Sequence, residues 1–161
     1  MRCRMRNLAW CVGIAGVALV LDQVSKAWAR TALAAGPQPF IPGVMELVLV
    51  GNTGAAFSIG AGSQWVFVLI ALAVCAGILV WVWRERTMPC ALARALGCVL
   101  GGGVGNLVDR LATGTVTDFF ATTFIDFPVF NVADIFVTLG VFATLVLYWR
   151  WDVAREAKRN G

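Results

Sequence analysis

The chain has 161 residues, of which 60% are hydrophobic and only 14% are charged. A soluble domain has about half apolar and a quarter charged residues, so these values exclude a water-soluble globule. Four bilayer spans of about 20 residues each would use half of the chain and leave too little for a sizeable separate domain. The net charge of +4 comes from bases at the ends of apolar runs, so membrane topology explains it better than nucleic-acid binding. We therefore expect an all-α membrane protein with a single domain over residues 1–161.

The apolar runs predict four spans, at about 8–28, 64–83, 92–111 and 132–151. The first run follows a basic start and so also resembles a signal peptide. Against cleavage, Asp22, Gln23 and Lys26 continue in helical register, and only a loose cleavage-like patch follows, at residues 32–35. The third span carries glycines at 101–103 and 105, which would let neighbouring helices approach closely in a membrane.

Lysine and arginine residues lie mainly at one end of the spans. Ten of the 13 flank the two termini and the connection between spans two and three, and the other three are Lys26, Arg30 and Arg110. By the positive-inside rule, both termini are expected in the cytoplasm, as in a bacterial inner membrane. Four spans are enough for a self-contained monomer in contact with membrane lipid.

The two outer segments, at about 29–63 and 112–131, are unusually apolar for loops. Residues 45–50 have the β-branched pattern of a short strand. Residues 51–62 are punctuated by Gly and Asn, which predicts a turn and a short amphipathic element on the membrane surface. Neither segment contains cysteine, so no disulfide is expected.

The chain has no histidine, which excludes His-assisted nucleophiles and HExxH zinc sites. Its five cysteines show no CxxC spacing, so a metal or redox pair is unsupported. We expect chemistry based on carboxylates, without metal or cofactor. A Ser and Lys dyad is the competing hydrolytic design, with Ser25 or Ser58 beside Lys26. Ser25 adjoins Lys26 and points about 100° away from it on a helix.

Four acidic residues converge at one depth near the outer interface: Asp22, Asp109, Asp118 and Asp134. A carboxylate near hydrocarbon is costly and therefore usually functional. Some of these polar groups also have a purely structural explanation. Asp22 could pair with Lys26 at i, i+4, Asp109 with Arg110 could cap span three, and Asn131 could cap span four.

Asp118 and Asp134 differ from the others because no Lys or Arg lies between residues 111 and 149. Asp126 also lacks a local base, but its surroundings are typical of a loop tip that faces water. Two unpaired carboxylates at one interface would share a proton, as in aspartic proteases. One acid would take a proton from the attacking water and the other would protonate the oxyanion and the leaving amine. A small ion-coupled transporter with a carboxylate proton relay and a non-catalytic membrane scaffold remain alternatives.

Five motifs, in this order, closely resemble the lipoprotein signal peptidase (signal peptidase II) family. They are Leu21–Lys26, Asn52–Ser58, Gly105–Leu111, Val116–Phe119 and Phe130–Ile135. The resemblance covers nearly the whole chain. The sequence departs from the family pattern at two positions. Thr117 stands where the family often has an aliphatic residue, and Phe120 follows the Phe of the fourth motif.

The resemblance implies an inner-membrane aspartic endopeptidase with its active site at the outer, periplasmic face. Its substrates would be prolipoproteins, cut just before a cysteine that carries a diacylglyceryl group. It implies Asp118 and Asp134 as the catalytic pair, and an outer segment folded into a small strand cradle with a short surface helix. The implied substrate-binding or supporting residues are Asp22, Lys26, Asn52, Gly54, Gly102, Asn106, Asp109, Arg110 and Asn131.

Overall fold

The computed structural model describes residues 2–54 and 64–160. Its helices are α1 (Arg2–Ala32), α2 (Gln64–Arg84), α3 (Cys90–Thr113) and α4 (Val132–Asn160), and its strands are β1 (Gln38–Ile41), β2 (Met45–Asn52) and β3 (Val116–Thr122). All four helices are long and apolar enough to cross a membrane, as the four apolar runs predict. The fold is mostly helical with one small three-stranded sheet, so the expected helical part and the expected small strand element are both present.

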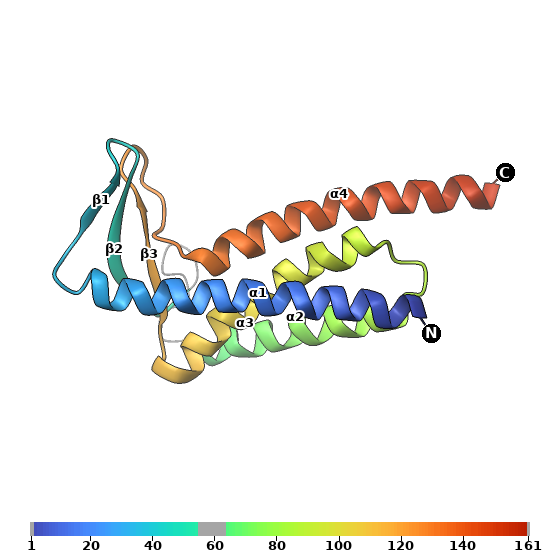
Figure 1. Cartoon of the computed structure of the whole chain (residues 1–161), viewed down its shortest axis with the longest axis horizontal. Helices are drawn as coiled ribbons and strands as arrows, with labels where there is room; N and C mark the ends of the chain where they lie inside the picture. Colours follow the sequence, from blue (N-terminus) through green and yellow to red (C-terminus); the bar gives the residue numbers. More distant parts are fainter. Residues whose placement is uncertain (1, 55–63, 161) are drawn as a thin grey trace.

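The helices form a bundle with two different ends (Figure 1). Both termini lie at one end, which we call the terminal end, and the sheet lies at the other, which we call the sheet end. The helices α1 and α4 extend beyond the predicted spans, to Arg2 and Asn160. Hydropathy marks only the apolar part of a helix, whereas Ala, Arg, Glu and Lys continue it readily into a polar environment.

Helix α3 is the central element and packs against the other three helices. A Cβ atom on Gly97 or Gly101 would come within 2.6 Å or 2.5 Å of a carbonyl oxygen of α1. A Cβ atom on Gly102 would come within 2.5 Å of the Ala133 carbonyl oxygen of α4. The glycines therefore allow the close helix contacts expected from the sequence.

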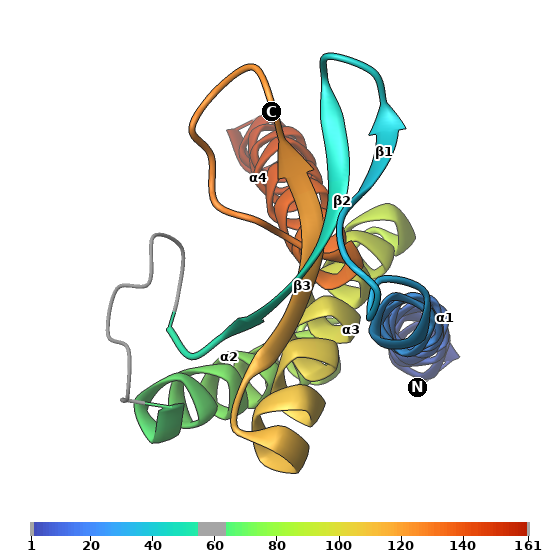
Figure 2. The same cartoon turned by 90° about the vertical axis from the view of Figure 1, so that its left-hand side faces the viewer.

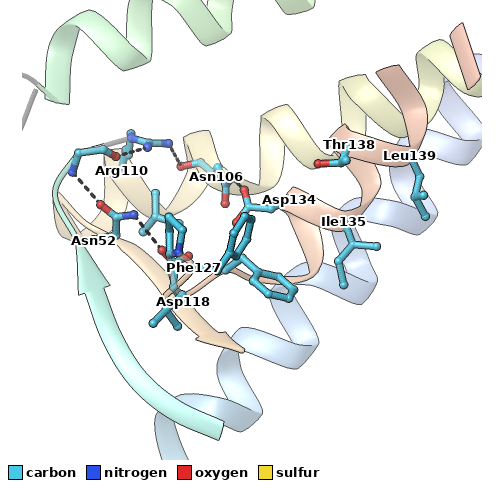
Figure 3. Close-up of a pocket in the computed structure, with 14 residues that line it drawn as sticks. Asn52, Asn106, Arg110, Asp118, Phe127, Asp134, Ile135, Thr138 and Leu139 are labelled. Carbon is cyan, nitrogen blue, oxygen red and sulfur yellow. Dashed lines mark hydrogen bonds between the residues drawn. The ribbon is translucent and has the colours of Figure 1, made fainter. Parts of the chain in front are cut away.

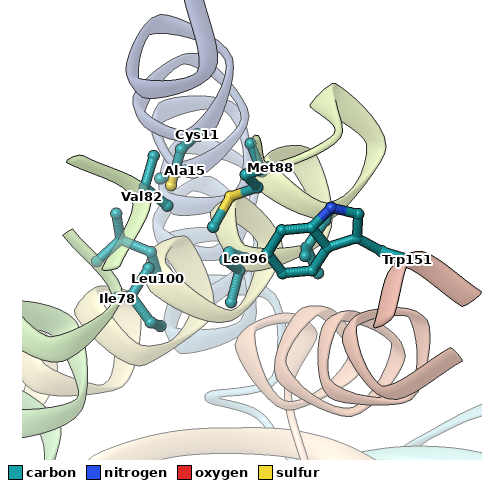
Figure 4. Close-up of a cluster of buried hydrophobic side chains, with 10 residues drawn as sticks. Cys11, Ala15, Ile78, Val82, Met88, Leu96, Leu100 and Trp151 are labelled. Carbon is teal, nitrogen blue, oxygen red and sulfur yellow. The ribbon is translucent and has the colours of Figure 1, made fainter. Parts of the chain in front are cut away.

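A cluster of buried apolar side chains fills the bundle towards the terminal end (Figure 4). At the same end, the buried Asn7 donates a hydrogen bond of 2.7 Å to the Met88 carbonyl oxygen, which ties α1 to the connection between α2 and α3. We call these side chains the apolar cluster: Cys11, Ala15, Ile78, Val82, Met88, Leu92, Ala93, Leu96, Leu100 and Trp151.

The sheet has the order β1-β2-β3, with both neighbouring pairs antiparallel. Its strands run across the direction of the helices (Figures 1 and 2). Leu47 and Phe119 of the sheet pack against Ala29 and Leu33 at the end of α1, which fixes the sheet to the bundle. The expected strand at 45–50 is confirmed as part of β2. Most of the expected surface element at 51–62 lies outside the described residues.

The turn after α3 determines where β3 begins. Gly114 has a φ of 78° and its N–H donates to the Arg110 carbonyl oxygen, so it ends the helix in the left-handed conformation that glycine adopts readily. The chain then enters β3, where Asp118 pairs in register with Val50 of β2. The sequence had placed Asp118 only in a short connection between two spans.

Candidate active site

A cavity of about 530 Å³ lies at the sheet end, where β3, α3 and α4 meet the end of β2 (Figure 3). Its polar wall is formed by Asn52, Asn106, Arg110, Asp118 and Asp134. Its other wall is largely apolar and is formed by Val116, the segment 127–130, Ile135 and Leu139. Two carboxylates therefore face the same space as an apolar surface.

Asp118 reaches the cavity from β3 and is only 2% exposed. It accepts hydrogen bonds from Asn131 Nδ2 at 2.6 Å and from Asn52 Nδ2 at 2.9 Å. Burial is the largest cause of its raised pKa, which increases from 3.8 to about 6. The charge of Asp134 also raises this pKa, whereas the hydrogen bonds from Asn52 and Asn131 lower it. Asp118 therefore keeps its proton to a higher pH than an ordinary aspartate.

Asp134 lies in the first turn of α4, where the helix dipole favours a negative charge. Its carboxylate accepts hydrogen bonds from Asn106 Nδ2 at 2.8 Å and from the Asn131 backbone N–H at 3.1 Å. The Asp134 N–H in turn donates to Asn131 Oδ1 at 3.0 Å, which is the reciprocal pattern of a helix N-cap. Asn131 thus caps α4 and at the same time contacts both carboxylates.

The two carboxylates are linked through the side-chain amide of Asn131. Its Nδ2 donates both to Asp118 Oδ1 and to Asn106 Oδ1, the latter at 3.1 Å, and Asn106 donates to Asp134. Asn131 itself is fully buried. Such a network holds both acids in one arrangement without neutralising either of them.

Asn52, Gly54 and Arg110 close one side of the cavity (Figure 3). Asn52 Oδ1 accepts the Gly54 N–H at 2.9 Å, and Arg110 Nη2 donates to the Gly54 carbonyl oxygen at 3.0 Å. Arg110 therefore binds the backbone after β2, and among the described residues it forms no ion pair with the adjacent Asp109. The structure therefore does not pair Asp109 with Arg110, and Asp109 instead accepts the Thr117 N–H at 2.9 Å.

The remaining expected residues lie behind the cavity wall. Lys26 Nζ is 2.9 Å from Asp22 Oδ2, 3.4 Å from Asp109 Oδ2 and 2.8 Å from Asn106 Oδ1. Asp22 Oδ1 accepts the Ala133 N–H at 2.9 Å. Gly102 adjoins the same part of α4. The structure thus brings Asp22, Lys26 and Asp109 together next to the cavity but not into its lining.

Three polar residues at this end were not foreseen. Arg30 contacts Asp109 Oδ1 through Nη2 at 3.0 Å and donates from Nε to Thr117 Oγ1 at 3.0 Å. Gln23 donates to Asp22 Oδ2 at 3.0 Å and to the Gly105 carbonyl oxygen at 3.2 Å. Arg30 follows Lys26 by four residues, so helical spacing could have identified it. No local sequence pattern predicts the contacts that Gln23 and Thr117 make.

The competing designs can be compared with this geometry. The Ser25 hydroxyl donates to the Asp22 carbonyl oxygen at 2.8 Å, so it is bonded to its own helix, and Ser58 lies outside the described residues. Asp118 belongs to a strand at the end of the bundle, whereas a transporter site is expected near mid-membrane. Within residues 2–54 and 64–160, no group of three or more His, Cys, Asp or Glu side chains is placed to hold a metal ion.

Comparisons with known proteins agree on one family. The family model of signal peptidase II matches residues 14–150. A lipoprotein signal peptidase of Parasynechococcus marenigrum is 43% identical over 152 residues, covering 93% of each chain. One of Symbiobacterium thermophilum is 46% identical over 147 residues, covering 88% of this chain and 97% of that one.

Two solved structures of bacterial membrane enzymes have the same fold. One has a TM-score of 0.81 at 27% identity and covers 87% of each chain. The other has a TM-score of 0.76 at 28% identity and covers 84% of this chain and 90% of that one. Because the family model spans most of the chain and the relatives match nearly all of it, the chain belongs to the signal peptidase II family and is a membrane-bound aspartic peptidase.

Proposed function

We propose that this peptidase cleaves the signal peptide from prolipoproteins just before a diacylglyceryl-modified cysteine, with Asp118 and Asp134 as the catalytic pair. The observation that carries this proposal is the network in which Asn131 and Asn106 hold both carboxylates at one cavity. The relatives that match nearly the whole chain are lipoprotein signal peptidases, which supports the substrate class.

In the proposed reaction Asp134 is the base and Asp118 holds the proton. Asp134 lies at the start of α4 and its carboxylate accepts two hydrogen bonds, so donors already face the group that would act as the base. The pKa of Asp118, about 6, favours the protonated form. Asp134 takes a proton from water as the water oxygen bonds to the amide carbon, and Asp118 protonates the oxyanion. The C–N bond then breaks as Asp134 passes its proton to the leaving amine, and Asp118 takes back the proton from the former oxyanion as the carbonyl re-forms.

The apolar wall of the cavity supports a lipid-bearing substrate. Ile135 and Leu139 line the cavity on α4, and their side chains are 39% and 63% exposed in the isolated chain. In a membrane this surface of α4 would face lipid, so acyl chains could enter the cavity without crossing water. The sheet would cover the peptide on the opposite side.

Charge distribution supports the proposed orientation. The terminal end carries ten of the 13 Lys and Arg residues, and the sheet end carries Lys26, Arg30 and Arg110. The positive-inside rule then puts both termini in the cytoplasm and the cavity at the outer face of a bacterial inner membrane. A monomer contains all groups named in the reaction.

The proposal is tested by incubating the purified protein in detergent with a diacylglyceryl-modified prolipoprotein and, separately, with its unlipidated precursor. We expect cleavage of the lipidated precursor alone, immediately before the modified cysteine, as read by mass spectrometry. Asp118→Asn and Asp134→Asn should each abolish cleavage, whereas Asp152→Asn at the terminal end should not. Near-normal activity of either active-site variant would exclude the catalytic pair, and cleavage of both precursors would exclude the lipid requirement.

A further inference from the structure

Lys26 is a fully buried cation that the proposed reaction does not use. Its side chain lies between Asp22 and Asp109, and it is 0% exposed. A buried Lys is costly unless it is paired, and its removal would leave two buried carboxylates with less compensation. Pairing alone, however, does not explain its third contact, which is with Asn106.

Asn106 has a side-chain amide whose two ends are used differently. Its Oδ1 accepts from Lys26 Nζ at 2.8 Å and from Asn131 Nδ2 at 3.1 Å. Its Nδ2 donates to Asp134 Oδ1 at 2.8 Å. If the amide were turned over, its NH₂ group would face the ammonium of Lys26 and its oxygen would face the carboxylate of Asp134. Two donors would then face each other at Lys26, and two acceptors would face each other at Asp134.

We propose that Lys26 is a positioning residue that fixes the direction of the Asn106 amide, so that Asp134 always receives a hydrogen-bond donor. This inference rests on the proposed role of Asp134 as the base. Lys26 acts through Asn106, because it does not line the cavity. Its own position is fixed by Asp22, which is bonded to the Ala133 N–H, and by Asp109, which is bonded to the Thr117 N–H.

The hydrogen bond that Asp134 receives from Asn106 should therefore depend on Lys26. The charged groups around this point are Asp22, Lys26 and Arg30 on α1, Asp109 and Arg110 on α3, and Asp118 on β3. Among the described residues, Lys26 is the charged group of this set that donates to Asn106 Oδ1. Its loss leaves Asn131 as the remaining hydrogen-bond donor to that oxygen, so the direction of the amide is held less firmly.

The test is the pH dependence of cleavage by the full-length protein carrying Lys26→Met. We expect kcat to fall by about 10- to 100-fold, the range found when outer partners that orient metal ligands are removed. The acidic limb of the pH profile of kcat/KM should move to higher pH, because Asp134 has lost a fixed hydrogen-bond donor. The KM should change little, since Lys26 is outside the cavity lining.

Arg30→Met is the matched control, because Arg30 also pairs with Asp109 but does not contact Asn106. It should leave the acidic limb in place.

If Lys26→Met fails to fold, the double variant Asp22→Asn/Lys26→Met removes an ion pair without changing the net charge, and it should show the same displaced limb. The inference would be overturned if the acidic limb stayed in place in a folded variant that lacks Lys26. It would also be overturned if Arg30→Met moved the acidic limb by the same amount. Failure of the unaltered protein to cleave, or activity of Asp134→Asn, would instead refute the proposed function.

Discussion

Helices α1 and α3 pack along each other by different chemistry at their two ends. Towards the terminal end the contact consists of glycines and the apolar cluster (Figure 4). At the sheet end it consists of four charged residues that we call the charge cluster: Asp22, Lys26, Arg30 and Asp109. Apolar packing has no preferred direction, whereas ion pairs and hydrogen bonds fix particular atoms.

This difference assigns separate roles to the two ends. Buried ion pairs add little net stability, because the cost of removing two charges from water offsets much of their attraction. The apolar cluster should therefore determine how firmly the helices hold together. Within the charge cluster, Asp22, Lys26 and Asp109 should determine where Asn106 and Asp118 lie.

Apart from substitution of the two acids themselves, the largest effect on activity is expected from Gly105→Ala. A Cβ atom at Gly105 would collide with Oδ2 of Asp22, so Asp22 could not keep its contacts with both Lys26 and the Ala133 N–H. A displacement of about 1 Å can cost about 100-fold in rate, and we expect a loss of that size in a cleavage assay. Gly103→Ala is the control, since its Cβ would lie 3.6 Å from Cys75 Sγ, an ordinary contact. Equal activity of the two variants would contradict the role of the charge cluster.

The largest effect on stability is expected at the other end, from Leu92→Ala. Leu92 is 0% exposed and belongs to the apolar cluster, so its truncation should lower the free energy of unfolding by about 2–5 kcal/mol. Unfolding in mixed detergent measures this change, with the 64% exposed Leu145 truncated to Ala as the control. The pH profile of cleavage below the unfolding temperature should not change. A displaced profile would mean that the two ends are coupled.

A smaller and more specific effect is expected from Asn52→Ala. The pKa of Asp118 is raised to about 6, so its protonated form is lost as the pH rises through that value. The hydrogen bond from Asn52 Nδ2 to Asp118 Oδ2 opposes this increase. Its removal should raise the pKa of Asp118 further and move the alkaline limb of kcat/KM to higher pH. A limb that moves to lower pH would argue against Asp118 as the group that holds the proton.

The smallest effect is expected from Thr117→Val, which removes the hydrogen bond from Arg30 Nε to Thr117 Oγ1. The Thr117 backbone N–H still binds Asp109 Oδ2 at 2.9 Å, so β3 keeps its attachment to α3. We expect a loss of about 1 kcal/mol in stability and nearly unchanged cleavage. A loss of activity as large as that of Gly105→Ala would show that the hydroxyl itself positions Asp118.

The sequence predicted much of this arrangement because the signals are local. Apolar runs identified the four helices, and β-branched residues identified the strand at 45–50. The absence of nearby bases separated Asp118 and Asp134 from the other acids. The i, i+4 spacing anticipated the pairing of Asp22 with Lys26, which is 2.9 Å long.

Other features follow only from the tertiary structure. Asn106 contacts Lys26 across 80 positions of sequence, and Asn52 contacts Asp118 across 66. Neither contact leaves a periodic pattern in the chain. The sequence by itself determined the helices, one of the strands and which two acids have no nearby base, because these depend on hydropathy, spacing and local charge. The tertiary structure alone decided that Arg110 binds Gly54 and that Asn131 joins the two acids, because a hydrogen bond needs its donor and acceptor within about 3 Å, and only the packed backbones bring them that close.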